Sequence, residues 1–211
     1  MATVQSPPEQ RILLRNVKWE TYERLLADLA DSAAPRLTFD RGTLEIMSPT
    51  AEHEKHNRRL AQLVTTLADE LGLEAEDLGS TTFKRADLAR GFEPDSCFYV
   101  QHEGRIRGRE QLDLISDPPP DLVIEVDIIS PSLDKLPLYA RLGVPEVWRY
   151  DGSTLTIFRL GAGAYHEAAD SAVLPGVTSA DLTRLMAEGR GLGRTAWLRR
   201  VRAWVRGARP R

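Results

Sequence analysis

The segment Leu122–Ile129 (LVIEVDII) constrains the fold more than any other part of the sequence. It is rich in β-branched and apolar residues, a composition typical of a central strand that is buried on both faces. Glu125 and Asp127 interrupt it two residues apart, so both side chains leave the same face of the strand. Because burying unpaired carboxylates is costly, we expect this face to open onto a cleft or to hold a cation between the two acids. The alternative is an edge strand whose wet face solvates both acids.

Further candidates for the same site come from neighbouring elements. Asp95 follows a proline and opens the apolar segment 95–101, which predicts a strand next to the one that carries Glu125. A second carboxylate from a neighbouring strand would suit a hard divalent cation such as Mg²⁺, although an aspartate after proline is also a common turn residue. Lys135 begins the helix after the Glu125 strand, so chain direction brings it toward the carboxyl end of that strand. An exposed helix lysine is its commoner role, and Lys84 is the alternative cation.

The order of strand and helix patterns predicts one α/β domain. Apolar residues at helical spacing indicate helices over residues 19–31, 50–71, 133–142, 179–188 and 195–206. Alternating or continuous apolar segments indicate strands at 36–40, 43–47, 74–77, 81–85, 95–101, 121–129, 146–150 and 154–160. This order predicts a mixed sheet flanked by helices. We expect residues 1–10 to form a loose tail, residues 1–188 the domain, and residues 189–211 a basic amphipathic C-terminal helix.

Charge is distributed unevenly along the 211 residues, whose net charge is −3. Residues 189–211 contain eight arginines and no acidic residue, while the other 188 residues hold 20 of the 28 basic residues and all 31 acidic ones, a net charge of −11. The basic end can meet a polyanion, lie on a membrane surface, or fold back onto the acidic body or a second subunit. Its apolar face, with Trp197, Val201 and Trp204 at helical spacing, favours docking or dimerisation.

Composition also limits the compartment. No apolar segment approaches the roughly 18 residues needed to cross a bilayer, and the first residues lack an apolar signal segment. The single cysteine, Cys97, has no internal disulfide partner, which indicates a reducing compartment. We therefore expect a cytoplasmic protein without stable membrane insertion.

Several stretches resemble the PD-(D/E)XK nuclease superfamily, and within it the Uma-two family of restriction-endonuclease-like proteins. The matching stretches cover most of residues 35–160 and are MSPTAEHEKHNRRL (47–60), GSTTFKR (79–85), GFEPDSCFYV (91–100), PPDLVIEVDIISPSLDKLPLYARLGVPEVWRYDG (119–152) and TLTIFRL (154–160). The resemblance implies a restriction-endonuclease-like αβββαβ core and a phosphodiesterase that depends on Mg²⁺, with Mn²⁺ as a substitute. It also implies that Asp95 and Glu125 bind the metal and that Lys135 is the cation of the active site.

The sequence departs from the superfamily pattern at one position. Asp127 stands where a lysine is expected two residues after the glutamate, so either Lys135 has taken the role of that lysine or the lysine is absent. Asp127 would then be a third metal ligand or accept a proton through a water. On the preceding helix, periodicity places His53 on the buried, site-facing side, Glu54 away from it and Glu52 at the flank. A satisfied structural histidine is the alternative interpretation of His53.

These features predict a Mg²⁺-dependent endonuclease that acts on DNA as a homodimer, because two active sites would cut the two strands of a duplex. The alternative is a nucleic-acid-binding or interaction module that has kept the fold and lost turnover, with Asp127 marking the loss. A membrane-surface protein that works through the C-terminal helix is a third hypothesis. The sequence identifies no residue that contacts bases.

Overall fold

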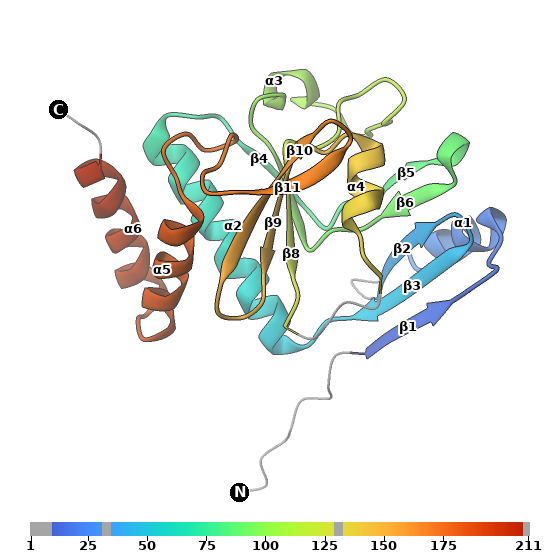
Figure 1. Cartoon of the computed structure of the whole chain (residues 1–211), viewed down its shortest axis with the longest axis horizontal. Helices are drawn as coiled ribbons and strands as arrows, with labels where there is room; N and C mark the ends of the chain where they lie inside the picture. The colour runs from blue at the N-terminus through green and yellow to red at the C-terminus, as the bar shows by residue number, and fades with distance from the viewer. Residues whose placement is uncertain (1–9, 31–34, 129–132, 209–211) are drawn as a thin grey trace, which may run out of the picture.

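A computed structural model describes residues 10–30, 35–128 and 133–208 as two β-sheets with helices packed around them (Figure 1). Within these ranges the larger sheet has six strands in the order β11-β10-β9-β8-β7-β4. Their bounds are β4 Glu76–Gly79, β7 Ser96–Tyr99, β8 Leu122–Val126, β9 Glu146–Tyr150, β10 Leu155–Gly161 and β11 Ala164–Ala168. β8 and β9 are parallel and the other neighbours are antiparallel, which confirms the predicted mixed sheet.

A smaller antiparallel sheet lies beside the larger one. In the part of the chain that the structure describes it has five strands in the order β1-β3-β2-β6-β5. Their bounds are β1 Gln10–Leu14, β2 Arg36–Asp40, β3 Thr43–Ser48, β5 Phe83–Arg85 and β6 Arg90–Phe92. The sequence did not predict a second sheet, because β5 and β6 have only three residues each and join the sheet through the pairing of β6 with the distant strand β2. The expected tail lies outside the described residues, except for Gln10, which begins β1.

The helices form largely where the sequence predicts them. They are α1 Trp19–Asp28, α2 Ala51–Leu71, α3 Glu103–Ile106, α4 Leu136–Leu142, α5 Ser179–Arg190 and α6 Arg194–Ala208, with a 3-10 turn at Ala86–Leu88. α2 begins where the Thr50 hydroxyl accepts a hydrogen bond from the His53 amide at 3.1 Å. It ends at Gly72, whose φ of 71° is left-handed. The order α2-β4-β7-β8-α4-β9 around the larger sheet is the αβββαβ core that the resemblance implies.

β8 is covered on both faces. One face packs into a core formed with α2, α5 and α6, and its residues are Leu122, Ile124 and Val126. The opposite face lies toward α4, where Val123 packs against Leu138 and Tyr139 of that helix. Glu125 shares this second face because it is two residues from Val123. The prediction of a central strand is therefore confirmed, and the edge-strand alternative is wrong.

The basic C-terminal helix docks on the domain, as predicted. Figure 1 shows α6 and α5 beside α2 at one end of the larger sheet. The face of α6 that is buried in the main core consists of Trp197, Leu198, Val201 and Val205. On its exposed side, Arg206 Nε lies 2.8 Å and Arg202 Nε 3.7 Å from the Glu70 carboxylate of α2. None of the helices in the described ranges is long and apolar enough to cross a membrane.

Candidate active site

Asp95 and Glu125 meet where the start of β7 lies beside the end of β8. The two strands are antiparallel, and Ser96 pairs with Ile124, so the residues just beyond this pair are neighbours across the strands. The main-chain amide of Val126 donates a hydrogen bond of 2.7 Å to Oδ2 of Asp95. The structure thus brings together the two carboxylates that the sequence assigned to one site.

Cationic and polar side chains surround Asp95, which is almost fully buried. Arg36 donates from Nη1 to Oδ1, and Nε2 of His53 lies 3.1 Å from Oδ2. Asn57 Nδ2 donates to the Asp95 carbonyl at 2.9 Å and fixes the backbone at this point. Burial alone would raise the pKa of Asp95, but the His53 hydrogen bond and the Arg36 charge outweigh burial and lower the pKa to about 2. Asp95 is therefore ionised at neutral pH.

Glu125 forms a buried ion pair with Lys135. Lys135 Nζ donates to Oε2 at 2.8 Å, and the Tyr139 hydroxyl donates to Oε1. Burial raises the pKa of Glu125, and the Lys135 charge only partly offsets it. Burial would lower the pKa of Lys135, but the charges of Glu125 and Asp95 outweigh burial and raise it. Lys135 is therefore a cation at neutral pH, and its ammonium points at the Glu125 carboxylate.

The place of Lys135 follows from the path of the chain. β8 ends at Val126 and α4 begins at Leu136, so the residues just before the helix return over the end of the strand. Lys135 is the N-cap residue of α4. The alternative cation, Lys84 on β5, donates instead to Glu23 of α1 at 3.0 Å in an exposed pair. Of the two candidate lysines, Lys135 is the one that reaches the carboxylates.

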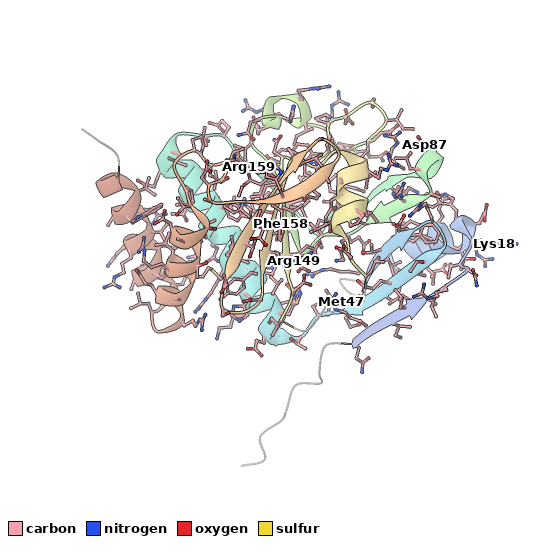
Figure 2. The ribbon with its side chains drawn as sticks, in the orientation of Figure 1. Lys18, Met47, Asp87, Arg149, Phe158 and Arg159 are labelled. Atoms are coloured by element: carbon pink, nitrogen blue, oxygen red, sulfur yellow. The ribbon has the colours of Figure 1, made fainter. Side chains whose placement is uncertain are left out.

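Asp127 lies just past the end of β8 and faces two arginines. Arg149 Nε on β9 is 3.2 Å from Oδ2, and an Nη atom of Arg11 on β1 is 3.5 Å from Oδ1. Figure 2 shows Arg149 below Phe158, and its guanidinium lies 5.2 Å from the centre of that ring. Burial raises the pKa of Asp127, against the opposing charges of Lys135, Arg149 and Arg11. Asp127 thus sits between cations contributed by both sheets.

A very small cavity separates these groups. Glu125, Asp127, Lys135, Tyr139 and Arg149 are among the side chains that line it, and its volume is about 10 Å³. This is about the space that one ordered water needs. Glu125 and Asp127 therefore face the same cavity, as their spacing along the strand predicted.

Sequence analysis missed Arg36 and Tyr139, which complete the surroundings of the two carboxylates. Tyr139 follows Lys135 by four residues, so their helical spacing was a usable signal. Arg36 gave no signal, because its contact with Asp95 joins residues 59 positions apart. The second Nη atom of Arg36 donates to Glu54. The long Arg36 side chain therefore connects Glu54 to Asp95, although Glu54 itself lies on the more exposed side of α2.

The donor chemistry fits a hard divalent cation, because Asp95 and Glu125 offer the carboxylate oxygens that Mg²⁺ prefers. Each of these carboxylates already holds a cationic side chain, Arg36 on Asp95 and Lys135 on Glu125. Across residues 10–30, 35–128 and 133–208, no group of three or more His, Cys, Asp or Glu side chains is arranged to hold a metal ion. In this structure Arg36 and Lys135 supply the positive charge at the two carboxylates.

Comparison with known proteins assigns the chain to a family. A family model described as "Uma2: Putative restriction endonuclease" matches residues 19–190, which is most of the chain. Among solved structures, the chain is similar to the crystal structure of a "putative nuclease belonging to DUF820 from Anabaena variabilis ATCC 29413", with 12% sequence identity and a TM-score of 0.53. That match covers 81% of this chain and 99% of the other, and at such low identity it shows a shared fold alone. No curated protein matches the sequence. The chain therefore belongs to the Uma2 family and has its restriction-endonuclease-like fold.

Proposed function

We propose that this protein is a Mg²⁺-dependent endonuclease that hydrolyses phosphodiester bonds in DNA. The observation that carries the proposal is the convergence of Asp95 and Glu125 at the ends of two adjacent strands, with Lys135 Nζ 2.8 Å from Glu125 Oε2. A buried arrangement of this kind stabilises a fold poorly, because desolvation of the charges offsets their attraction. Its presence in a member of a nuclease family supports a catalytic role.

In this proposal Asp95 and Glu125 hold the metal, and Mg²⁺ or Mn²⁺ suits the same oxygen donors. When bound, the divalent ion supplies a Lewis acid for a phosphate oxygen and lowers the pKa of a coordinated water. The protein contributes the orientation of the donors. His53 and the Val126 amide hold Oδ2 of Asp95, and the Tyr139 hydroxyl holds Oε1 of Glu125.

Lys135 and Asp127 are the proposed catalytic side chains. The Lys135 ammonium would stabilise negative charge that develops on the phosphate or orient the attacking water. Asp127 faces the same cavity and would accept a proton from that water through its carboxylate. His53 would act through Asp95, because its Nε2 lies 3.1 Å from the Asp95 carboxylate and its side chain is fully buried.

The proposal extends to the organisation of the protein. We assign the nuclease domain to residues 1–188, with a core of about 35–160. We treat residues 189–211 as an added segment, whose helix α6 docks on α2. A homodimer would bring two carboxylate sites to the two strands of a duplex, and a DNA substrate agrees with a cytoplasmic location. Light scattering coupled to size-exclusion chromatography tests the dimer: a mass near that of one 23.6 kDa chain would contradict it.

A cleavage assay on supercoiled plasmid and on single-stranded DNA in Mg²⁺ tests the function. We expect the wild type to nick and linearise plasmid, and we expect Asp95→Asn and Glu125→Gln to lower the rate by on the order of a thousandfold or more, the scale of a lost metal ligand. Glu167→Gln on β11 is the matched control, because it makes the same chemical change at an exposed position. Mg²⁺ binding by calorimetry should disappear in the two site variants. Cleavage at wild-type rates in Glu125→Gln would refute the assignment.

A second candidate is a nucleic-acid-binding module with this fold that has lost turnover. It is favoured by Asp127 at the position of the motif lysine, and by the lack of any cluster of three or more potential metal ligands among the described residues. The same assay separates the two functions. A lapsed module would bind DNA without cleaving it, in Mg²⁺ and in Mn²⁺, and Glu125→Gln would leave its affinity for DNA unchanged.

A further inference from the structure

An open groove lies on the surface next to the carboxylate site. Its volume is about 300 Å³, and it is lined by Glu52, Lys55, His56 and Arg59 of α2, Gly152 of the turn after β9, and Arg190 at the end of α5. Three segments that are far apart in the sequence therefore contribute to one concave surface. None of these residues takes part in the carboxylate site described above.

The groove is cationic, and its cations are free of carboxylate partners. Lys55, Arg59 and Arg190 face the single acid Glu52, and within the described residues no carboxylate oxygen lies within 4.0 Å of their side-chain nitrogens. Arg206 on α6, by contrast, is paired with Glu70 at 2.8 Å. Unpaired cations gathered in one hollow of a protein with net charge −3 favour an anionic ligand.

Arg190 is held in position by neutral acceptors rather than by an acid. An Nη atom of Arg190 donates to the Gly152 carbonyl at 3.0 Å and lies 3.4 Å from the Tyr150 hydroxyl. These bonds orient the guanidinium over the turn after β9 and leave its charge uncompensated. A guanidinium fixed in this way retains donors for a phosphate, which it binds in a planar, forked geometry.

The half-buried imidazole of His56 lies close enough to all three cations for their charges to affect its pKa. Its ring packs 5.3 Å from the ring of Tyr150. Burial lowers the pKa of His56, the charges of Arg190, Arg59 and Lys55 lower it further, and Glu52 alone opposes them. His56 is therefore uncharged at neutral pH and lines the groove beside the three cations.

The groove borders the carboxylate site through two shared elements. On α2, His53 contacts Asp95 at 3.1 Å and lies one helical turn before His56. On β9, the Tyr150 carbonyl accepts from the Asp127 amide at 2.8 Å, directly before the turn that carries Gly152. Figure 1 shows the start of α2, the end of β8 and the turn after β9 at the same edge of the larger sheet.

We propose that this groove, through Lys55, Arg59 and Arg190, binds the phosphodiester backbone of a nucleic acid strand beside the phosphate that reaches Asp95 and Glu125. The proposal rests on the proposed function for the position of that reacting phosphate. The groove offers charge and few shaped contacts, so binding through it is independent of base sequence. It provides the local positive surface that an acidic protein needs in order to hold a polyanion.

Fluorescence anisotropy with a labelled 20-base-pair DNA duplex tests the groove apart from catalysis. Both triple variants are made in the Glu125→Gln background, so that the probe stays intact. The groove variant carries Lys55→Gln, Arg59→Gln and Arg190→Gln. The matched control carries Arg199→Gln, Arg200→Gln and Arg206→Gln, three exposed arginines farther along α6, and loses the same charge. A labelled single strand of the same length is the second probe.

We expect the groove variant to bind the duplex on the order of tenfold to a hundredfold more weakly at 0.1 M salt, and we expect its salt slope to fall by about 2 to 3. The α6 variant should stay within about threefold of its parent, because remote exposed charges are screened over a Debye length of about 10 Å. Since Arg190 also bonds to the protein, the double variant Lys55→Gln with Arg59→Gln repeats the test with α5 unchanged, and its salt slope should fall by about 2.

The outcomes separate the groove from the enzyme. Affinity of the groove variant equal to that of its parent overturns the proposal, and so does an equal loss in the groove and α6 variants. If the parent binds through the groove while the wild type cleaves neither substrate, the groove stands and the endonuclease assignment falls. If the wild type cleaves DNA while the groove variant keeps full affinity, the groove assignment falls and the endonuclease assignment stands.

Discussion

The carboxylate site and the interface between α6 and α2 both join basic side chains to acids, but they are built in opposite ways. At the site the charges themselves are buried: Asp95 is 2% and Glu125 5% exposed. At the interface the charges lie outside, with the Arg206 side chain 70% exposed, while Trp197 on the buried face of the same helix is 1% exposed. One region buries charge, and the other buries apolar surface under a charged rim.

The difference separates what stabilises the fold from what serves the site. Burial of apolar side chains is the main favourable term in folding, and exposed ion pairs add little to it. Buried ion pairs lose most of their attraction to desolvation, yet removing one partner is strongly destabilising. α6 should therefore be held by its tryptophan, whereas the carboxylate site is a set of charges that depend on one another. The predictions below test this contrast.

Truncation of Trp197 should have the largest effect. The indole is buried in the main core and donates from Nε1 to the Leu185 carbonyl at 2.8 Å. We expect Trp197→Ala to lower the free energy of unfolding by about 3–5 kcal/mol, measured by urea unfolding at neutral pH. Trp204→Ala on the same helix is the control. Because Trp204 is only partly buried, this variant should lower the free energy of unfolding much less. Equal losses in the two variants would mean that the buried face does not hold α6.

Removal of Lys135 should have the second largest effect. We expect Lys135→Met to lower the free energy of unfolding by about 3 kcal/mol at pH 8, because Glu125 is then buried without a counter-charge. The Glu125 pKa is already raised by burial and should rise further in Lys135→Met. A raised carboxyl pKa favours the folded state at low pH and loses this contribution as the pH rises, so the defect should shrink at pH 5. The double variant Lys135→Met with Glu125→Gln should recover stability at pH 8. A pH-independent defect would contradict this account.

The contribution of Asp95 to the free energy of unfolding should depend on pH in the opposite direction, falling as the pH falls. Its pKa is lowered from 3.8 to about 2, so its contribution is present above pH 3.8 and is lost as the pH falls toward 2. We expect the stability difference between the wild type and Asp95→Asn to decrease by on the order of 2 kcal/mol over this window. Chemical denaturation at a series of pH values measures it. A difference that stays constant from pH 4 to pH 2 would mean that Asp95 is not held in its ionised form.

Loss of the acid at the α6 interface should have the smallest effect. Glu70 accepts from Arg206 at 2.8 and 2.9 Å, but the guanidinium is exposed and therefore screened. Glu70→Gln should shift the unfolding temperature by about 2 °C or less, and the shift should vanish in 0.5 M salt. Calorimetry at two salt concentrations provides the measurement. A shift as large as that of Lys135→Met would erase the distinction between the two regions.

Much of the fold was predictable because local patterns and burial agree along most of the chain. β2, β3, α2 and β9 begin and end within one residue of the predicted bounds. The smaller sheet was not predicted as a unit, because β1 pairs with the distant strand β3, and the short strands β5 and β6 join the sheet where β6 pairs with the distant strand β2. Short strands carry too few residues for an alternating pattern to identify them.

The candidate site was predictable to a similar depth. Asp95, Glu125 and Lys135 could be grouped because they sit at the ends of consecutive elements, where chain direction limits their positions. Their roles as metal ligands and active-site cation remain predictions. Arg36 could not be grouped with them, since nothing local to β2 records a contact with Asp95.

The sequence by itself determined that a central strand carries two acids on one face, that a third acid begins the neighbouring strand, and that a lysine starts the next helix. These follow from periodicity and from the short connections between consecutive elements, which are properties of the chain over about 40 residues. Tertiary structure alone decided which arginines meet those acids. Arg36 and Arg11 come from the smaller sheet, and the free energy of a buried charge depends on every group that surrounds it, wherever in the chain that group originates.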